Sequence, residues 1–170
     1  MPAVAFDSLP PDARVWVFAA DSDIGHDAEH NLLHAVDDFL EQWNAHGHPL
    51  RCARSWRDGH FLAVGVDQTT AGASGCSIDG LFRVLQQLQP TLGASLLAGS
   101  RVYWRDSDGA ILSATRAEFA RLASGGSVSV STPVFDTSLT TAAEWRTRFE
   151  RAAGDSWHGQ LLETNARSHR

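Results

Sequence analysis

The chain of 170 residues contains no lysine, only two cysteines and no long apolar run. Without lysine it lacks a Schiff-base lysine, an anchor for pyridoxal phosphate and a phosphate loop of the GxxxxGK[ST] type. A membrane-spanning helix needs roughly 18 or more apolar residues in a row, and the N-terminal stretch lacks the basic and apolar regions of a secretory signal. We therefore expect a cytoplasmic protein without membrane association.

The negative net charge of the chain indicates that nucleic acid is not its partner. Its formal net charge is -6, from 20 acidic residues and 14 arginines, and the arginines are scattered along the sequence. Binding to nucleic acid or to an anionic membrane surface usually shows as a clustered basic patch. The length predicts a single domain over residues 1–170, with a core over 1–106 and an extension over 107–170 packed on it.

Hydrophobic periodicity predicts an alternation of strands and helices over the first hundred residues. Short β-branched and aromatic runs indicate strands, and apolar residues at helical spacing indicate two helices, one ending at a cap at Gly47 and one at Pro90. The order is Val15–Ala19, helix 27–46, Leu50–Trp56, His60–Val66, a helix capped at Ser74 or Ser77 that stops at Pro90, and Arg101–Arg105. This βαββαβ order predicts an α+β, ferredoxin-like core, an antiparallel four-stranded sheet with two helices on one face.

A hairpin and further helices are expected after this core. Asp108-Gly109 indicates a turn into a strand around Ile111 and Leu112. Two capping boxes, Thr115 with Glu118 and Thr141 with Glu144, mark helix starts, because the threonine accepts from the third helical amide while the glutamate reaches back. We expect these helices to end at Gly125 and Gly154, and the stretch SGGSVSVST to lead into an edge strand.

The most distinctive candidate site surrounds Cys76, in the small-residue segment AGASGCSIDG (71–80). In the predicted topology one end of the sheet gathers His46, His48, Asp67, Cys76 and Asp79, and His60 lies at the other end. A thiol at a helix N-terminus is favoured as thiolate, and nearby histidine and aspartate resemble a nucleophilic set. Asp79 acts in the opposite direction and raises the thiol pKa. The alternative is a small buried cysteine at a tight junction, which is also our interpretation of Cys52.

Other histidines and aromatic residues have simpler interpretations. His26, His30 and His34 share a helix face opposite the apolar one, so we expect a solvated face and no metal site. Trp43 and Trp145 fall on apolar helix faces and are expected in the core. His158, in the polar quartet Asp155 to His158, either folds over the Cys76 end of the sheet or anchors the C-terminal region through Trp157. No cofactor is expected.

Several stretches resemble an uncharacterised family of small bacterial proteins whose members often carry the label "ABC transporter ATPase". They are RVWVFAAD (14–21), WNAHGHPL (43–50), VDQTTAGASGCSID (66–79), TPVFD (132–136) and SWH (156–158), and ASGCSID is the most distinctive. The resemblance implies a role for residues within these motifs, among them His46, Cys76 and His158. The ATPase label conflicts with the missing phosphate-loop lysine.

Two functions from different classes follow from these observations. The first is a non-catalytic binding or assembly module that uses an open sheet face or the C-terminal hairpin to form a homodimer or to hold a protein partner. The alternative is a thiol-dependent enzyme of unknown small-molecule substrate. In it Cys76 is the nucleophile or redox thiol, His46 or His158 is the base, and Asp67 or Asp79 orients the base.

Overall fold

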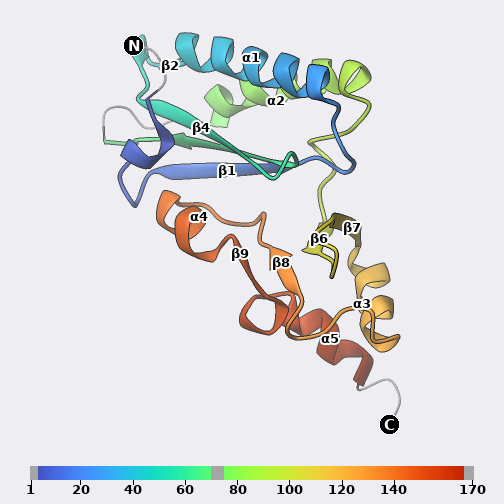
Figure 1. Cartoon of the computed structure of the whole chain (residues 1–170). Helices are drawn as coiled ribbons and strands as arrows, with labels where there is room; N and C mark the ends of the chain where they lie inside the picture. Colours follow the sequence, from blue (N-terminus) through green and yellow to red (C-terminus); the bar gives the residue numbers. More distant parts are fainter. Residues whose placement is uncertain (1–3, 70–74, 167–170) are drawn as a thin grey trace. The chain divides into compact units, whose positions relative to one another are not determined.

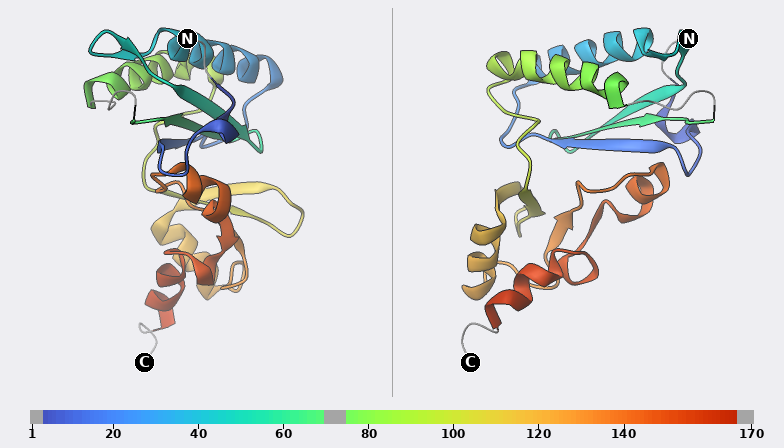
Figure 2. Two further views of the ribbon diagram at one scale, coloured as in Figure 1. Left: turned by 90° about the vertical axis from the view of Figure 1, so that its left-hand side faces the viewer. Right: turned by 180° about the vertical axis from the view of Figure 1, so that it is seen from behind.

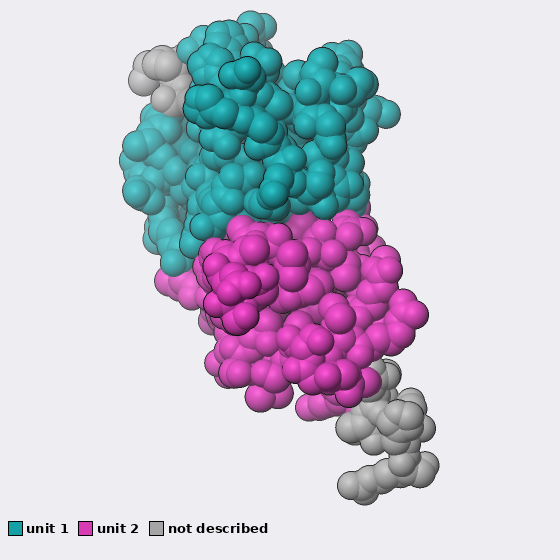
Figure 3. Space-filling view, turned by 45° about the vertical axis from the view of Figure 1, so that its right-hand side comes forward, with its two compact units in different colours: residues 1–98, 137–146 teal, residues 99–136, 147–170 magenta. Residues whose placement is uncertain are grey.

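The computed structural model describes residues 4–69 and 75–166, and it describes their side chains except those of residues 75–77 and 164–166. The chain divides into two compact units, shown in different colours in Figure 3. Unit 1 comprises residues 1–98 and 137–146, and unit 2 comprises residues 99–136 and 147–170. The α+β class expected from the sequence is confirmed, because both units combine helices with antiparallel strands. Among the described helices, none is long and apolar enough to span a bilayer.

Unit 1 is built on a three-stranded antiparallel sheet in the order β1-β5-β4. The strands are β1 (Arg14–Ala19), β4 (Cys52–Arg57) and β5 (Phe61–Val66). Helices α1 (His26–Gln42) and α2 (Gly75–Leu92) cover one face of this sheet (Figures 1 and 2). Apolar residues of the two helices, such as Leu32 and Leu85, pack there against alternate strand residues, and their burial stabilises the unit.

The opposite face of the sheet carries a short 3-10 helix, η1 (Phe6–Ser8), near β5. Gly65 permits this close approach, since a Cβ atom at that position would lie 2.6 Å from Cδ1 of Leu9 and 3.2 Å from the ring of Phe6. Trp145, from α4 (Ala142–Arg148), packs on Phe6 with ring centroids 6.3 Å apart. The sheet of unit 1 is therefore covered on both faces by segments of its own unit.

The expected four-stranded sheet of the ferredoxin-like arrangement is not what the described strands form. The strand at Arg101–Arg105, which we assigned to the core, belongs to unit 2 as β6 and pairs there with β7 (Ile111–Thr115) and β8 (Pro133–Phe135). The Asp-Gly turn that follows β6 returns β7 directly onto it. At the edge of β1, the amide of Val15 instead donates to the carbonyl of Thr140 at 2.8 Å.

The first helix ends four residues earlier than expected, at Gln42, and its predicted cap has another role. After α1 the chain forms a small hairpin of β2 (Asn44–Ala45) and β3 (His48–Pro49). His46 and Gly47 form its turn with positive φ values of 53° and 79°. A helix cap and a two-residue hairpin turn both favour glycine for its positive φ, so the sequence signal did not separate them. Helix α2 also passes the predicted stop at Pro90 and ends at Leu92, so the proline lies inside its last turn.

Unit 2 contains an antiparallel sheet in the order β7-β6-β8-β9, with β9 at Glu150–Ala152. Helices α3 (Arg116–Ser124) and α5 (Gly159–Ala166) pack against each other. Their apolar residues form a core with Val102, Trp104 and Val134 of the sheet.

Both predicted capping boxes are present and Gly125 ends α3 as expected. Two expectations are wrong: α4 ends at Arg148, well before Gly154, and β8 lies inside the sheet.

Candidate functional site

The predicted site around Cys76 divides into a described and an undescribed part. Figure 1 shows the end of α1, the β2–β3 hairpin and the start of α2 at one end of unit 1, as the topology argument expects. Cys76 is the second residue of α2, and its side chain lies outside the described part, as do residues 70–74. Its reactivity therefore stays a prediction.

The candidate bases and orienting groups of unit 1 lie in different settings. His46 and His48 are solvent-exposed on the β2–β3 hairpin, and Asp79 is exposed on α2. Asp67, by contrast, is buried at the end of β5. Asp67 is thus the one predicted site residue of unit 1 whose described side chain is enclosed by protein.

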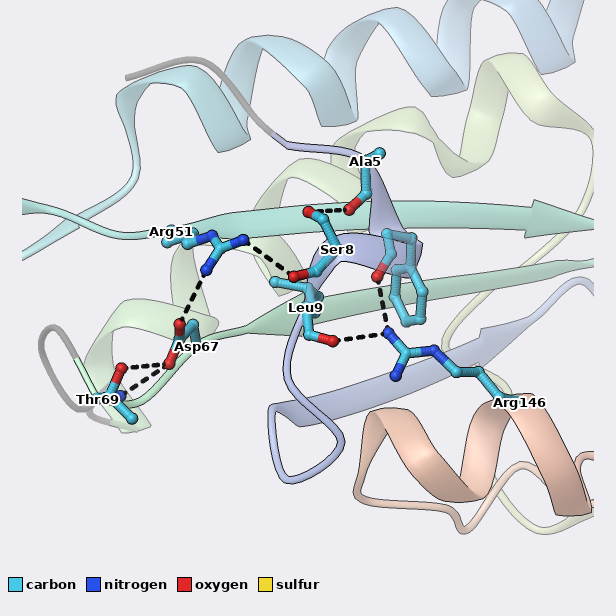
Figure 4. Close-up of polar contacts among 8 residues, drawn as sticks. Ala5, Ser8, Leu9, Arg51, Asp67, Thr69 and Arg146 are labelled. Atoms are coloured by element: carbon cyan, nitrogen blue, oxygen red, sulfur yellow. Dashed lines mark hydrogen bonds and ion pairs between the residues drawn. The ribbon is translucent and has the colours of Figure 1, made fainter.

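The carboxylate of Asp67 is held by neighbouring polar groups (Figure 4). Oδ1 accepts from the backbone N of Thr69 at 3.0 Å and from its hydroxyl at 2.7 Å, while Oδ2 lies 3.5 Å from Nη1 of Arg51. These hydrogen bonds from Thr69, and then the charge of Arg51, lower the pKa of Asp67. Arg51 also donates to the carbonyl oxygen of Ser8 at 2.9 Å. Asp67 therefore ties the end of β5 to Arg51, and Arg51 in turn binds η1 through Ser8.

A second arginine strengthens the same region of unit 1. Nη2 of Arg146 donates to the carbonyl oxygens of Phe6 at 3.1 Å and of Leu9 at 2.8 Å, which anchors η1 to α4 (Figure 4). The carbonyl oxygens of Phe6, Ser8 and Leu9 thus accept hydrogen bonds from arginine side chains of the same unit. This pattern supports a structural role for Asp67 and Arg51.

His158, the other candidate base, is a core residue of unit 2. It is 1% exposed, its Nδ1 lies 2.8 Å from the hydroxyl of Ser156, and its ring stacks on Trp157 with centroids 3.9 Å apart. The indole N–H of Trp157 donates to Asp136 at 3.2 Å. Burial lowers the pKa of His158 to about 4, so the ring is neutral at pH 7. Of our two interpretations, the contacts match the one in which His158 packs on Trp157.

The remaining candidates agree with the simpler interpretations. Cys52 is fully buried, and burial raises the pKa of its thiol to about 11. Trp43 and Trp145 are buried in the core of unit 1. His26, His30 and His34 are exposed on α1, which agrees with the expected solvated face.

Unit 2 contains a surface feature that the sequence analysis did not assign. An open hollow of about 660 Å³ lies between the β6–β7 hairpin and α3, and we call it the hairpin groove. Its lining residues are Arg101, Trp104, Leu112, Ser113, Ala114, Glu118, Arg121 and Leu122. A volume of this size is typical of ligand sites in proteins. The groove therefore has the size of a binding site.

Local sequence rules explain how the hairpin groove forms. The Asp-Gly turn places β7 against β6, and the capping box of Thr115 starts α3 immediately after β7 ends. In α3, Glu118, Arg121 and Leu122 follow the spacing i, i+3, i+4, which puts them on one helix face. Phe119 is buried on another face and contacts Trp104, with ring centroids 5.2 Å apart. The turn, the cap and the buried phenylalanine together fix the helix beside the hairpin.

One exposed apolar residue, Leu112, marks the hairpin groove. Leu112 is 42% exposed, which is unusual for a large apolar residue of this chain, and it lies in the lining. In the described part only Phe82 and Val130 are other exposed large hydrophobic residues, and neither lines the groove. The hydrophobic spacing of β6 and β7 was visible in the sequence, but only the pairing of the strands shows that Leu112 and Trp104 are neighbours.

Comparisons with known proteins do not extend this picture. No protein-family model, no curated protein and no solved structure matches the chain.

Proposed function

We propose that the protein is a non-catalytic binding module and that its hairpin groove takes an extended segment of a partner protein. The observation that carries the proposal is the groove itself, with Leu112 exposed beside Trp104 and Leu122. Among the described residues, its lining includes no histidine or cysteine, the side chains expected of a nucleophilic or acid–base site. Four apolar residues, Trp104, Leu112, Ala114 and Leu122, line it together with four polar ones, a mixture that suits recognition of a partner segment.

The shape of the site favours an extended peptide as the occupant. β7 is the outermost strand in the order of its sheet, and α3 runs along the other side of the hollow. Peptides that bind between a strand and a helix adopt an extended conformation, and pockets for alternate side chains supply the specificity. We infer that an apolar side chain of the partner contacts Trp104, Leu112 and Leu122.

Replacing Leu112 by serine is expected to weaken this binding about fivefold, because about 1 kcal/mol of apolar burial is lost from a half-exposed side chain. The measurement is the affinity of peptides selected from a random library against the purified full-length protein. Val130→Ser is the matched control, since Val130 is 64% exposed in the same unit and lies outside the lining. Equal weakening by both substitutions would contradict the proposal.

The oligomeric state distinguishes a partner protein from a second copy of this chain. We expect sedimentation equilibrium to give the same mass for the wild type and for Leu112→Ser. A wild-type dimer that Leu112→Ser dissociates would show that the groove is occupied by another copy, which would overturn the partner-segment proposal.

The alternative function, a thiol-dependent enzyme, predicts a reactive Cys76. If it is correct, Cys76 should be alkylated in the native protein with an apparent pKa clearly below the ordinary value of about 8.5. Cys52 is the internal control, because its burial and raised pKa of about 11 should keep it unlabelled until the protein unfolds. Site-resolved mass spectrometry over a pH series measures both. For the binding module we expect slow labelling of Cys76 without a depressed pKa.

A further inference from the structure

We infer that the segment bound in the hairpin groove carries a carboxylate side chain next to its apolar one. This inference rests on the proposed function and adds the chemical class of the partner segment. It follows from the charged residues of the lining, which are Arg101, Glu118 and Arg121.

Arg101 presents a positioned guanidinium at one part of the groove. Its Nε and Nη2 atoms donate to the hydroxyl of Ser113 across the hairpin at 3.2 and 3.1 Å. A guanidinium has five N–H donors, and these two bonds use two of them. Because the side chain is already held in place, an incoming carboxylate pays less of the entropy of ordering it.

Glu118 lines the hairpin groove, but its carboxylate caps the start of α3. Its Oε2 accepts from the backbone N of Thr115 at 2.8 Å and from the hydroxyl of Thr115 at 3.0 Å. These bonds, and after them the charges of Arg121 and Arg101, lower the pKa of Glu118. Glu118 is thus held by the capping box, and Arg101 and Arg121 lie with it in the lining of the groove.

The groove is consequently positive within an acidic protein. Its lining carries two arginines and one glutamate, whereas the whole chain has a formal net charge of -6. Two arginines and one glutamate beside four apolar lining residues complement an acidic side chain next to an apolar one, and such complementarity directs specificity and encounter. Arginine is also well suited to carboxylate recognition, because its planar donors match the two oxygens.

Three matched peptides of about seven residues, a common strand length, test the inference. Each is fluorescein-labelled and has a central leucine, flanked by glutamate, by glutamine or by lysine. Fluorescence anisotropy gives their affinities for the full-length protein and for its Arg121→Glu, Arg83→Glu and Leu112→Ser variants. Arg83 is an exposed arginine of α2 outside the groove and provides the matched charge control.

For the wild type we expect the glutamate peptide to bind about threefold to fivefold more tightly than the glutamine peptide, the range for a partly exposed ion pair. Arg121→Glu should shift the preference toward the lysine peptide, and Arg83→Glu should leave it unchanged. Equal binding of all three peptides, weakened by Leu112→Ser, would overturn this inference and leave the proposed function standing. Binding that is absent, or indifferent to Leu112→Ser, would overturn the proposed function as well.

Discussion

Lowering the pH from 7 to 4 is expected to reduce the free energy of unfolding by about 3 kcal/mol through His158 alone. Its pKa is lowered from 6.5 to about 4, chiefly by burial, with the charges of Arg116 and Arg151 acting in the same direction against Asp136. A pKa difference of one unit corresponds to roughly 1.4 kcal/mol. Because the residue is 1% exposed, solvent screens this effect little.

The direction follows from proton linkage. The unfolded chain binds a proton at His158 below pH 6.5, whereas the folded chain resists it until about pH 4, so stability is present above 6.5 and is lost as the pH falls between these values. Urea unfolding at several pH values measures the loss, and an NMR titration of the ring gives the pKa itself. His48→Gln, at an exposed histidine, should keep the wild-type pH dependence. A His158 ring that titrates near 6.5 would contradict the prediction.

Phe119→Ala is expected to lower the free energy of unfolding by about 3 to 5 kcal/mol, the usual cost of truncating a buried phenylalanine. Phe119 is fully buried and contacts both Trp104, at 5.2 Å between ring centroids, and His158, at 6.4 Å. It therefore fixes α3 on the sheet and shapes the hairpin groove. The substitution should reduce peptide binding together with stability.

Chemical denaturation of the Phe119→Ala variant, followed by tryptophan fluorescence, measures this loss. Val130→Ala is the control, because truncating an exposed side chain usually changes stability by no more than about 0.5 kcal/mol. A Phe119→Ala variant as stable as the control would show that α3 is not held by this contact.

Sequence motifs predicted the structure correctly where the contacts that form it join residues close together in the chain. The capping boxes at Thr115 and Thr141 both form, and the Asp-Gly turn after β6 produces the expected hairpin. Each of these features is completed by residues three to five positions apart. The sequence therefore predicted the class of the fold and most strands of both units.

Long-range choices could not be predicted in this way. The run Arg101–Arg105 has the same strand character whether it joins β1 or β8, and only the tertiary structure assigns it to β8. Gly47 has a positive φ in either a helix cap or a hairpin turn, so its role depended on residues further along the chain. The sequence likewise offers His158 as a base, whereas the tertiary structure buries it beside Trp157.

The hairpin groove was missed for the same reason. Its lining comes from two strands and one helix, and no short motif contains Arg101, Leu112 and Arg121 together. The sequence contained one signal for the groove. Leu112 is an apolar residue close to the turn of a predicted hairpin, and no packing partner was predicted for it. That signal becomes informative only when the exposed fraction of the side chain is known.

The most direct test of the central claim is a map of backbone and indole NMR signals of the full-length protein during titration with a library-selected peptide. We predict that the largest shifts occur at the indole N–H of Trp104 and at the amides of Leu112 and Leu122, with Val130 unaffected. Shifts confined to residues outside the hairpin groove would contradict the account, because the protein would then bind its partner through another surface.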